Sequence, residues 1–158
     1  MAKEIERKFL VKADAWHRPA NGEDLRQGYL STEEQRSVRV RTVRNESGQR
    51  GYITIKGRSY GASRDEYEYE IPFSEANEIL EHLCRRPLIE KIRYRISFEG
   101  LTWEVDEFRG ENRGLIVAEV ELNDEKQPVA KPDWVTDEVT GDSRYYNTNL
   151  ATRPFSSW

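Results

Sequence analysis

Three charged residues at alternate positions near the start of the chain, Glu4, Glu6 and Lys8, have types and a spacing that suit chemistry. In a β-strand, alternate side chains point to the same face and lie about 7 Å apart. Two carboxylates so placed can hold a hard divalent cation, and the ammonium beyond them can hold an anion that the cation also touches. The spacing therefore suits a metal and phosphate site. It equally suits a charged strand face in water.

Basic residues repeat this spacing of two, or occupy the matching face, in three later segments. They are Arg39 and Arg41 in 36–44, Lys56 in 51–57, and Lys91, Arg93 and Arg95 in 89–98. The alternate positions hold apolar or aromatic residues such as Val40, Ile92 and Tyr94. Several cations on one wall of a site suit a substrate with several negative charges.

Acidic residues form the corresponding face of three other segments. They are Glu66, Glu68 and Glu70 in 64–72, Glu104 and Asp106 in 101–108, and Glu119 and Glu121 in 115–122. A solvated sheet usually mixes the two signs within a strand, with cross-strand pairs worth a few tenths of a kcal/mol. Sorting by sign favours a charged cavity, in which polyphosphate bridged to divalent cations is the simplest ligand.

The elements that must position these side chains are strands. Alternating segments separated by Gly, Asn, Ser or Pro recur at 3–11, 24–30, 36–44, 51–57, 64–72, 89–98, 101–108 and 115–122, which predicts a mainly antiparallel β protein. A closed barrel of about eight strands has room inside for side chains or one small ligand. A charged lining then requires a wet, ligand-binding lumen, and we expect the apolar faces to point outward under helices.

The predicted helices are few. The segment 74–83 has Ser74 as a candidate cap and an apolar stripe of Ile79, Leu80 and Leu83. We expect two further short helices, near 124–127 and after Pro132, to cover the sheet. No repeat or linker divides the chain, so residues 1–158 are predicted to form one domain.

Composition limits the classes of partner. The net charge of −4 gives no general attraction to nucleic acid or to an anionic membrane. Cys84 is the only cysteine, which excludes an intrachain disulfide and a cysteine-based zinc site, while His17 and His82 lack a ligand-like spacing. We expect a cytoplasmic protein with a small-molecule substrate and no nucleic-acid or membrane partner. Uncovered apolar strand faces would suit a homodimer.

Taken in chain order, these motifs resemble the CYTH, or triphosphate tunnel metalloenzyme, family. The resemblance rests on Glu4-x-Glu6-x-Lys8, Arg39-x-Arg41, Lys56, Lys91-x-Arg93, Glu104-x-Asp106 and Glu119-x-Glu121. It covers nearly the whole chain, and the run from Trp103 to Phe108 is similar to that of short bacterial members. It implies an eight-stranded antiparallel β tunnel, in which basic residues hold a triphosphate and acidic ones hold Mg²⁺ or Mn²⁺.

The resemblance also implies roles for individual residues. Glu4, Glu6 and Glu121 would be the principal metal ligands, and Glu119 and Asp106 would support these ligands or a second metal and its water. The phosphate ligands would be Lys8, Arg39, Arg41, Lys56, Lys91 and Arg93. Arg95, Glu66 and Glu68 would line the tunnel. A glutamate-held water, with Glu119 as the catalytic candidate, would attack the terminal phosphorus in line.

Two further residues have two interpretations each. Tyr29 matches a tyrosine that pairs with the opening-motif lysine, here Lys8, as a catalytic dyad in some short bacterial members, and it equally suits a tyrosine packed for its ring. Arg144 matches an arginine near the carboxy-terminal helix that closes the tunnel onto the substrate. It equally suits a surface salt bridge.

The function implied is a metal-dependent hydrolase that cleaves the terminal phosphate of inorganic triphosphate. The family also includes class IV adenylyl cyclases, thiamine triphosphatases and RNA triphosphatases, which stay as alternatives. A cyclase needs a nucleoside pocket, for which Tyr60, Tyr67 and Trp103 are aromatic candidates and equally packing residues. A non-catalytic polyphosphate-binding module is a further alternative, and the presence of every matched acid counts against it.

Overall fold

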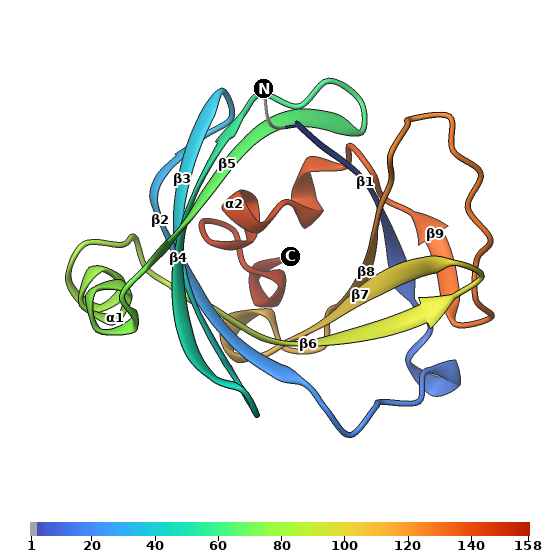
Figure 1. Ribbon diagram of the computed structural model, residues 1–158, viewed down its shortest axis with the longest axis horizontal. Coiled ribbons are helices and arrows are strands. Elements are labelled where there is room, and N and C mark those ends of the chain that lie inside the picture. Colours follow the sequence, from blue (N-terminus) through green and yellow to red (C-terminus); the bar gives the residue numbers. More distant parts are fainter. Residues whose placement is uncertain (1–2) are drawn as a thin grey trace.

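Nine β-strands form one sheet in the computed structural model, which describes residues 3–158 (Figure 1). They are β1 (Lys3–Val11), β2 (Glu23–Glu33), β3 (Arg36–Asn45), β4 (Gly48–Gly57), β5 (Ser63–Ile71), β6 (Ile89–Phe98), β7 (Leu101–Phe108), β8 (Ile116–Glu121) and β9 (Val135–Glu138). The spatial order is β5-β4-β3-β2-β6-β7-β8-β1-β9, and an antiparallel pairing of β1 with β5 closes the first eight strands into a barrel. The predicted eight-stranded barrel is confirmed, and β9 is an addition.

Strand β1, which contains the opening motif, has one edge divided between two partners. Its first residues pair with β5 and its last with β9, while its other edge pairs with β8. Between these partners the backbone bonds to two loops. The Glu6 amide donates to the Ala62 carbonyl at 3.1 Å, and the Lys8 amide donates to Thr140 Oγ1 at 2.9 Å. The loops after β4 and after β9 therefore meet at the motif.

The largest apolar cluster lies on the outer face of β1, β6, β7 and β8. Phe9 and Trp103 are fully buried there, and Trp16 packs on Trp134 with ring centroids 4.9 Å apart. The expected helices at 124–127 and after Pro132 are wrong: the first segment is a turn, and the second leads into β9. Trp134, in a turn, and Val135, at the start of β9, pack against the apolar face.

Helix α1 (Phe73–His82) covers the outer face of β3 and β4 through Ala76 and Leu80. Gly51 allows this close approach, because a Cβ atom there would lie 2.7 Å from Ala76 Cβ. Pro72, not Ser74, occupies the N-cap position, and no side chain caps the helix there. Leu83, predicted in the apolar stripe, lies just beyond the helix and is 67% exposed.

The carboxy-terminal segment, with α2 (Asn147–Leu150), lies inside the ring of strands (Figure 1). Tyr145 and Leu150 pack there against Ile89 and Phe108. Short 3-10 helices occur at Ala13–Ala15, Gly110–Asn112, Ser143–Tyr145 and Phe155–Ser157. The expectation that all apolar faces point outward is therefore wrong, since an apolar cluster fills part of the barrel interior. No helix in residues 3–158 is long and apolar enough to span a membrane.

Candidate active site in the barrel interior

Two adjoining cavities occupy the polar part of the barrel. The lumen cavity, of about 230 Å³, is lined by seven carboxylates and six cationic side chains: Glu4, Glu6, Glu66, Glu68, Glu104, Glu119, Glu121, Arg39, Arg41, Lys56, Lys91, Arg93 and Arg95. The mouth cavity has one carboxylate, Glu6, with the cations Lys8, Arg39, Lys56 and Arg64. The rest of its lining is rich in hydroxyl groups, from Tyr29, Ser37, Thr54, Ser59, Thr140, Tyr146 and Thr148. Glu6, Arg39, Lys56 and Asn147 line both cavities.

The strand register brings the predicted acidic residues together. Glu6 on β1 lies directly opposite Glu121 on β8, and Lys8 lies opposite Glu119. On the far edge of β8, Glu119 lies opposite Glu104 of β7. Because residues directly opposite in an antiparallel pair have neighbouring side chains, the opening motif and the second acidic pair form one wall of the lumen cavity.

The neighbouring negative charges on this wall make it harder for its carboxyl groups to ionise. Desolvation, together with the negative charges of Glu119 and Glu4, raises the pKa of Glu6 well above its ordinary value. Desolvation and the charges of Glu4 and Glu104 likewise raise the pKa of Glu121. A divalent cation would relieve this repulsion, and carboxylate oxygens are the donors that hard cations prefer. The donor set therefore fits such a metal.

The positions of these carboxylates do not form a metal-binding site in this structure. Across residues 3–158, no group of three His, Cys, Asp or Glu side chains is positioned to hold a metal ion. Instead, Lys56 Nζ lies 2.9 Å from Glu4 Oε2 and 3.2 Å from Glu66 Oε2. Desolvation alone would raise the pKa of Glu4, but its hydrogen bond with Glu66 and the Lys56 charge bring it down to about 2. One ammonium thus bridges two acids of the cavity, while burial and the hydrogen bond with Glu4 raise the pKa of Glu66 to about 7.

Asp106, predicted to support the metal, is engaged by two cations. Its two oxygens accept hydrogen bonds from Arg93 Nε at 2.8 Å and Nη2 at 2.9 Å, and Lys91 Nζ lies 2.7 Å away. The Asp106 side chain is 3% exposed and does not line either cavity. In this arrangement Asp106 orients Arg93 and Lys91.

Lys91, predicted to bind phosphate, is itself almost fully buried. Its ammonium donates to Asn147 Oδ1 at 3.1 Å and lies 5.2 Å from the centroid of the Phe108 ring. Desolvation lowers the pKa of Lys91 to about 8, although the Asp106 charge opposes this shift. A phosphate could therefore bind Lys91 only by taking the place of one of its present partners.

Arg39 and Arg41 share one carboxylate across the barrel wall. Their Nη2 atoms lie 3.5 and 3.7 Å from Glu68 Oε2. Arg39 also donates to Thr54 Oγ1 at 3.2 Å, and this hydroxyl donates to Glu68 at 2.7 Å. Arg95 pairs with Glu104 at 3.1 Å and also with Glu23. The predicted basic wall exists, and its cations are paired with acids.

The proposed dyad partners Lys8 and Tyr29 both line the mouth cavity. Lys8 Nζ donates to the Tyr145 carbonyl at 3.1 Å and lies 3.5 Å from Glu119 Oε1. Tyr29 is 4% exposed and belongs to the inner apolar cluster. Within the described chain no hydrogen bond joins the two side chains, so both interpretations of Tyr29 remain predictions.

Arg144 is not brought to either cavity. It is exposed, donates to Asp142 Oδ2 at 2.9 Å, and stacks on the rings of Tyr145 and Trp158 at 5.4 and 5.5 Å. This geometry matches the surface ion pair, one of the two interpretations of Arg144.

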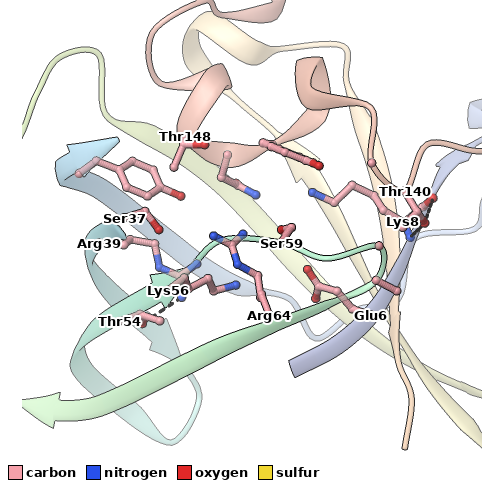
Figure 2. A pocket seen from close by; sticks show the side chains of 16 residues that line it. Glu6, Lys8, Ser37, Arg39, Thr54, Lys56, Ser59, Arg64, Thr140 and Thr148 are labelled. Atoms are coloured by element: carbon pink, nitrogen blue, oxygen red, sulfur yellow. Dashed lines mark hydrogen bonds between the residues drawn. The ribbon is translucent and has the colours of Figure 1, made fainter. Parts of the chain in front are cut away.

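Among the lining residues that were not predicted, Asn147 and Arg64 make the most informative contacts. Asn147 Oδ1 accepts from Gln27 Nε2 at 3.0 Å and from Lys91, which ties the carboxy-terminal segment to the barrel wall. No local pattern marks it, because the segment reaches the lumen through tertiary packing. Arg64 lies on the same face of β5 as Glu66, two residues earlier, so the strand period could have found it. Figure 2 shows it among the labelled side chains of the mouth cavity.

The closed barrel and its charge-sorted interior define a class of protein: an antiparallel β barrel with a charged lumen and a wall of carboxylates. A model of the CYTH domain matches residues 2–155. The chain therefore belongs to the CYTH domain family.

Two curated relatives align along nearly their whole lengths. One, named inorganic triphosphatase, from Acetivibrio thermocellus, is 56% identical over 158 residues, covering 100% of this chain and 99% of that protein. The other, from Nitrosomonas europaea and of the same name, is 37% identical over 151 residues, covering 94% of this chain and 96% of that protein. A crystal structure of an inorganic triphosphatase superposes with a TM-score of 0.66 at 32% identity, covering 96% of this chain and 95% of that one.

Proposed function

We propose that this protein is a metal-dependent hydrolase that cleaves inorganic triphosphate into orthophosphate and pyrophosphate. The observation that supports this most is the convergence of two acidic pairs and a basic wall in one lumen cavity. The two curated relatives named inorganic triphosphatase, aligned over nearly all of this chain, favour the same activity.

In the proposed site, Glu4, Glu6 and Glu121 would hold Mg²⁺ or Mn²⁺, with Glu119 beside them. A bound metal would neutralise phosphate oxygens and polarise the phosphorus under attack. Desolvation and like-charge repulsion together raise the pKa values of Glu6 and Glu121, and a bound cation would offset the repulsion. Lys56 would then be free to leave Glu4 and turn its ammonium toward the phosphate.

The basic wall would bind and orient the triphosphate. Arg39, Arg41 and Arg93 present fixed donors to an anion whose charge is spread over its peripheral oxygens, and such preorganised electrostatic stabilisation does most of the work in phosphoryl transfer. Asp106 would hold Arg93 in place through its two hydrogen bonds. Lys91 would anchor Asn147, which lines both cavities.

Glu119 would orient the attacking water. Desolvation opposes its ionisation, but the charges of Lys8 and Arg93 hold its pKa well below the ordinary range. Glu119 is therefore ionised at neutral pH and can accept a hydrogen bond from a water aligned with the terminal phosphorus. Lys8, 3.5 Å from Glu119, would contact the same region of the substrate, with Tyr29 as its proposed dyad partner.

The cyclase alternative receives little support from this interior. Tyr60 is 72% exposed, Tyr67 is 37% exposed, and Trp103 is fully buried in the outer cluster. None of these three candidate base-stacking residues lines the two cavities. A plant protein described as a putative adenylyl cyclase with dominant triphosphatase activity superposes with a TM-score of 0.54 at 13% identity, which is a likeness of fold alone.

A product assay tests the proposal. Purified protein is incubated with inorganic triphosphate, ATP or thiamine triphosphate, with Mg²⁺ or Mn²⁺ or with chelator, and phosphate, pyrophosphate and cyclic AMP are resolved. We expect equimolar orthophosphate and pyrophosphate from triphosphate, only with metal. Cyclic AMP and pyrophosphate from ATP would contradict the hydrolase, and tight binding without turnover of any substrate would favour the binding module.

We also propose that the chain acts as one domain in the cytoplasm, on a small-molecule substrate. A homodimer would form through the outer face of β4 and β5, where Ile55 and Tyr69 are 40% and 59% exposed. Sedimentation equilibrium tests this directly, and a monomer at high concentration would exclude it.

A further inference from the structure

Arg64 differs from the other cations of the interior in having no acidic partner. Every other Lys or Arg that lines the two cavities has a carboxylate oxygen within 4.0 Å. No carboxylate of residues 3–158 lies within that distance of Arg64. Its register partner on β1 is Glu4, whose carboxylate pairs with Lys56 instead. The Arg64 charge is therefore not neutralised by the protein.

The guanidinium of Arg64 is nevertheless held in a fixed place. Nε donates to the Gly57 carbonyl at 3.1 Å and Nη2 donates to the same oxygen at 2.8 Å. These bonds occupy two of the five N–H groups of the side chain. Figure 2 shows Arg64 extending into the mouth cavity near Ser59. The fixed head group leaves its remaining donors for a ligand.

The surroundings of Arg64 suit an anion that is bound without metal. The mouth cavity has four cations, Lys8, Arg39, Lys56 and Arg64, against the single carboxylate Glu6. Hydroxyl groups, including those of Ser37, Ser59 and Thr148, supply neutral donors. In the lumen cavity, by contrast, seven carboxylates outnumber six cations. The mouth cavity is therefore the part of the interior in which cations most outnumber carboxylates, and it suits an anion by charge.

We propose that Arg64 contacts substrate at a phosphate subsite in the mouth cavity, which holds the end of the triphosphate that is not cleaved. This inference rests on the proposed function and deepens it. The phosphorus under attack lies toward the carboxylate wall, and the chain of phosphates runs outward to Arg64. The ligand of the subsite is a terminal phosphate with unsubstituted oxygens, which a guanidinium can bind through two donors at once.

A contact at the uncleaved end is equally strong in the ground state and in the transition state. Such uniform binding lowers KM and leaves kcat unchanged. A residue that merely held the loop after β4 in place through Gly57 would instead affect thermal stability and kcat. The split between KM and kcat therefore separates the two roles.

The test compares R64Q with R36Q, which removes the same charge from an exposed arginine paired with Glu33 on the outer face. Binding of inorganic triphosphate is measured by calorimetry in chelator, and KM and kcat are measured with Mg²⁺. We expect R64Q to weaken binding and to raise KM by about tenfold or more, the value of one charge-assisted hydrogen bond. We expect kcat within about twofold of wild type, R36Q to match wild type, and R64K to recover part of the affinity.

The outcomes separate this inference from the proposed function. Wild-type affinity and KM in R64Q would overturn the subsite, as would a lower kcat and melting temperature with KM unchanged. If the wild type binds triphosphate, loses affinity in R64Q and yields no products, the subsite stands and the hydrolase fails. If the wild type hydrolyses triphosphate and R64Q behaves like R36Q, the hydrolase stands and the subsite fails. A wild type that does not bind triphosphate contradicts both.

Discussion

The lumen cavity and the mouth cavity are neighbours in one barrel and differ in how their charges are satisfied. In the lumen cavity, cations such as Arg93 and Lys56 are paired with carboxylates. In the mouth cavity, Arg64 bonds to a backbone carbonyl and the remaining donors are mostly hydroxyl groups. An anion that binds in the lumen cavity must therefore displace carboxylates from existing ion pairs. An anion that binds in the mouth cavity can contact Arg64, which has no carboxylate partner among residues 3–158.

This difference predicts different consequences of mutation. Removing one partner of a buried ion pair leaves an uncompensated charge and is strongly destabilising. Removing an unpaired cation at the mouth has no such penalty and acts on ligand affinity. We therefore expect substitutions in the lumen cavity to affect both stability and the proposed chemistry, and substitutions of Arg64 in the mouth cavity to affect mainly substrate binding.

The largest expected effect on stability is that of Asp106→Asn. The substitution leaves Arg93 and Lys91 without their buried counter-charge, and we expect the free energy of unfolding to fall by about 3–5 kcal/mol. Urea unfolding measures it. Glu33→Gln, which breaks the exposed pair with Arg36, is the matched control and should change stability by less than about 1 kcal/mol. Equal losses for the two variants would contradict the contrast between buried and exposed pairs.

The largest expected effect on activity is that of Glu6→Gln. The substitution removes a carboxylate from the proposed metal site, and we expect metal-dependent triphosphate turnover to fall by at least about 100-fold. The fold should be retained, because a neutral amide avoids the desolvation cost and the repulsion that raise the pKa of Glu6. Phosphate release measures the turnover, and thermal melting measures whether the fold is retained. Unaltered turnover would refute the ligand role of Glu6.

Asn147→Ala should have an intermediate effect. It removes the acceptor shared by the buried Lys91 and Gln27 side chains, and leaving such donors unsatisfied costs about 1–3 kcal/mol. We expect lower stability by that amount, measured by urea unfolding. Asn123→Ala in the exposed turn after β8 is the control, since only its backbone amide is hydrogen bonded there. A loss no greater than that of the control would show that Asn147 does not tie the carboxy-terminal segment to the wall.

The smallest effect is expected for Arg144→Ala. Because Arg144 pairs with Asp142 on the surface, outside both cavities, we expect KM and kcat for triphosphate within about twofold of wild type. A clear rise in KM would instead show that Arg144 reaches the substrate, and it would favour the tunnel-closing interpretation.

The strand faces could be predicted from the sequence because their period is local. Because side chains two residues apart in a strand share a face, Glu66 and Glu68 could be assigned to the interior without knowing the partner strands. The same holds for Arg39 and Arg41. The same period extends to Arg64, which was overlooked because its sign differs from that of Glu66. Sorting by sign therefore found the walls of the barrel and missed Arg64, a basic residue on the otherwise acidic interior face of β5.

Pairing within the interior could not be predicted in the same way. The ion pairs of Asp106 with Arg93 and Lys91 depend on the register of β6 with β7 and on the depth at which these side chains are buried. The position of Asn147 depends on the carboxy-terminal segment folding into the barrel, which follows from the packing of Tyr145 and Leu150 rather than from any periodic pattern. Segment 135–138 became a strand because the free edge of β1 offered a partner.

The most direct test of the division between the two cavities is a crystal structure of the Glu119→Gln variant, chosen to slow turnover, with Mn²⁺ and inorganic triphosphate, using anomalous scattering to locate the metal. We predict Mn²⁺ on the Glu4, Glu6 and Glu121 carboxylates, with the phosphate chain extending from the lumen cavity to Arg64 in the mouth cavity. A metal bound away from these carboxylates, or a triphosphate that lies outside the barrel, would contradict the account.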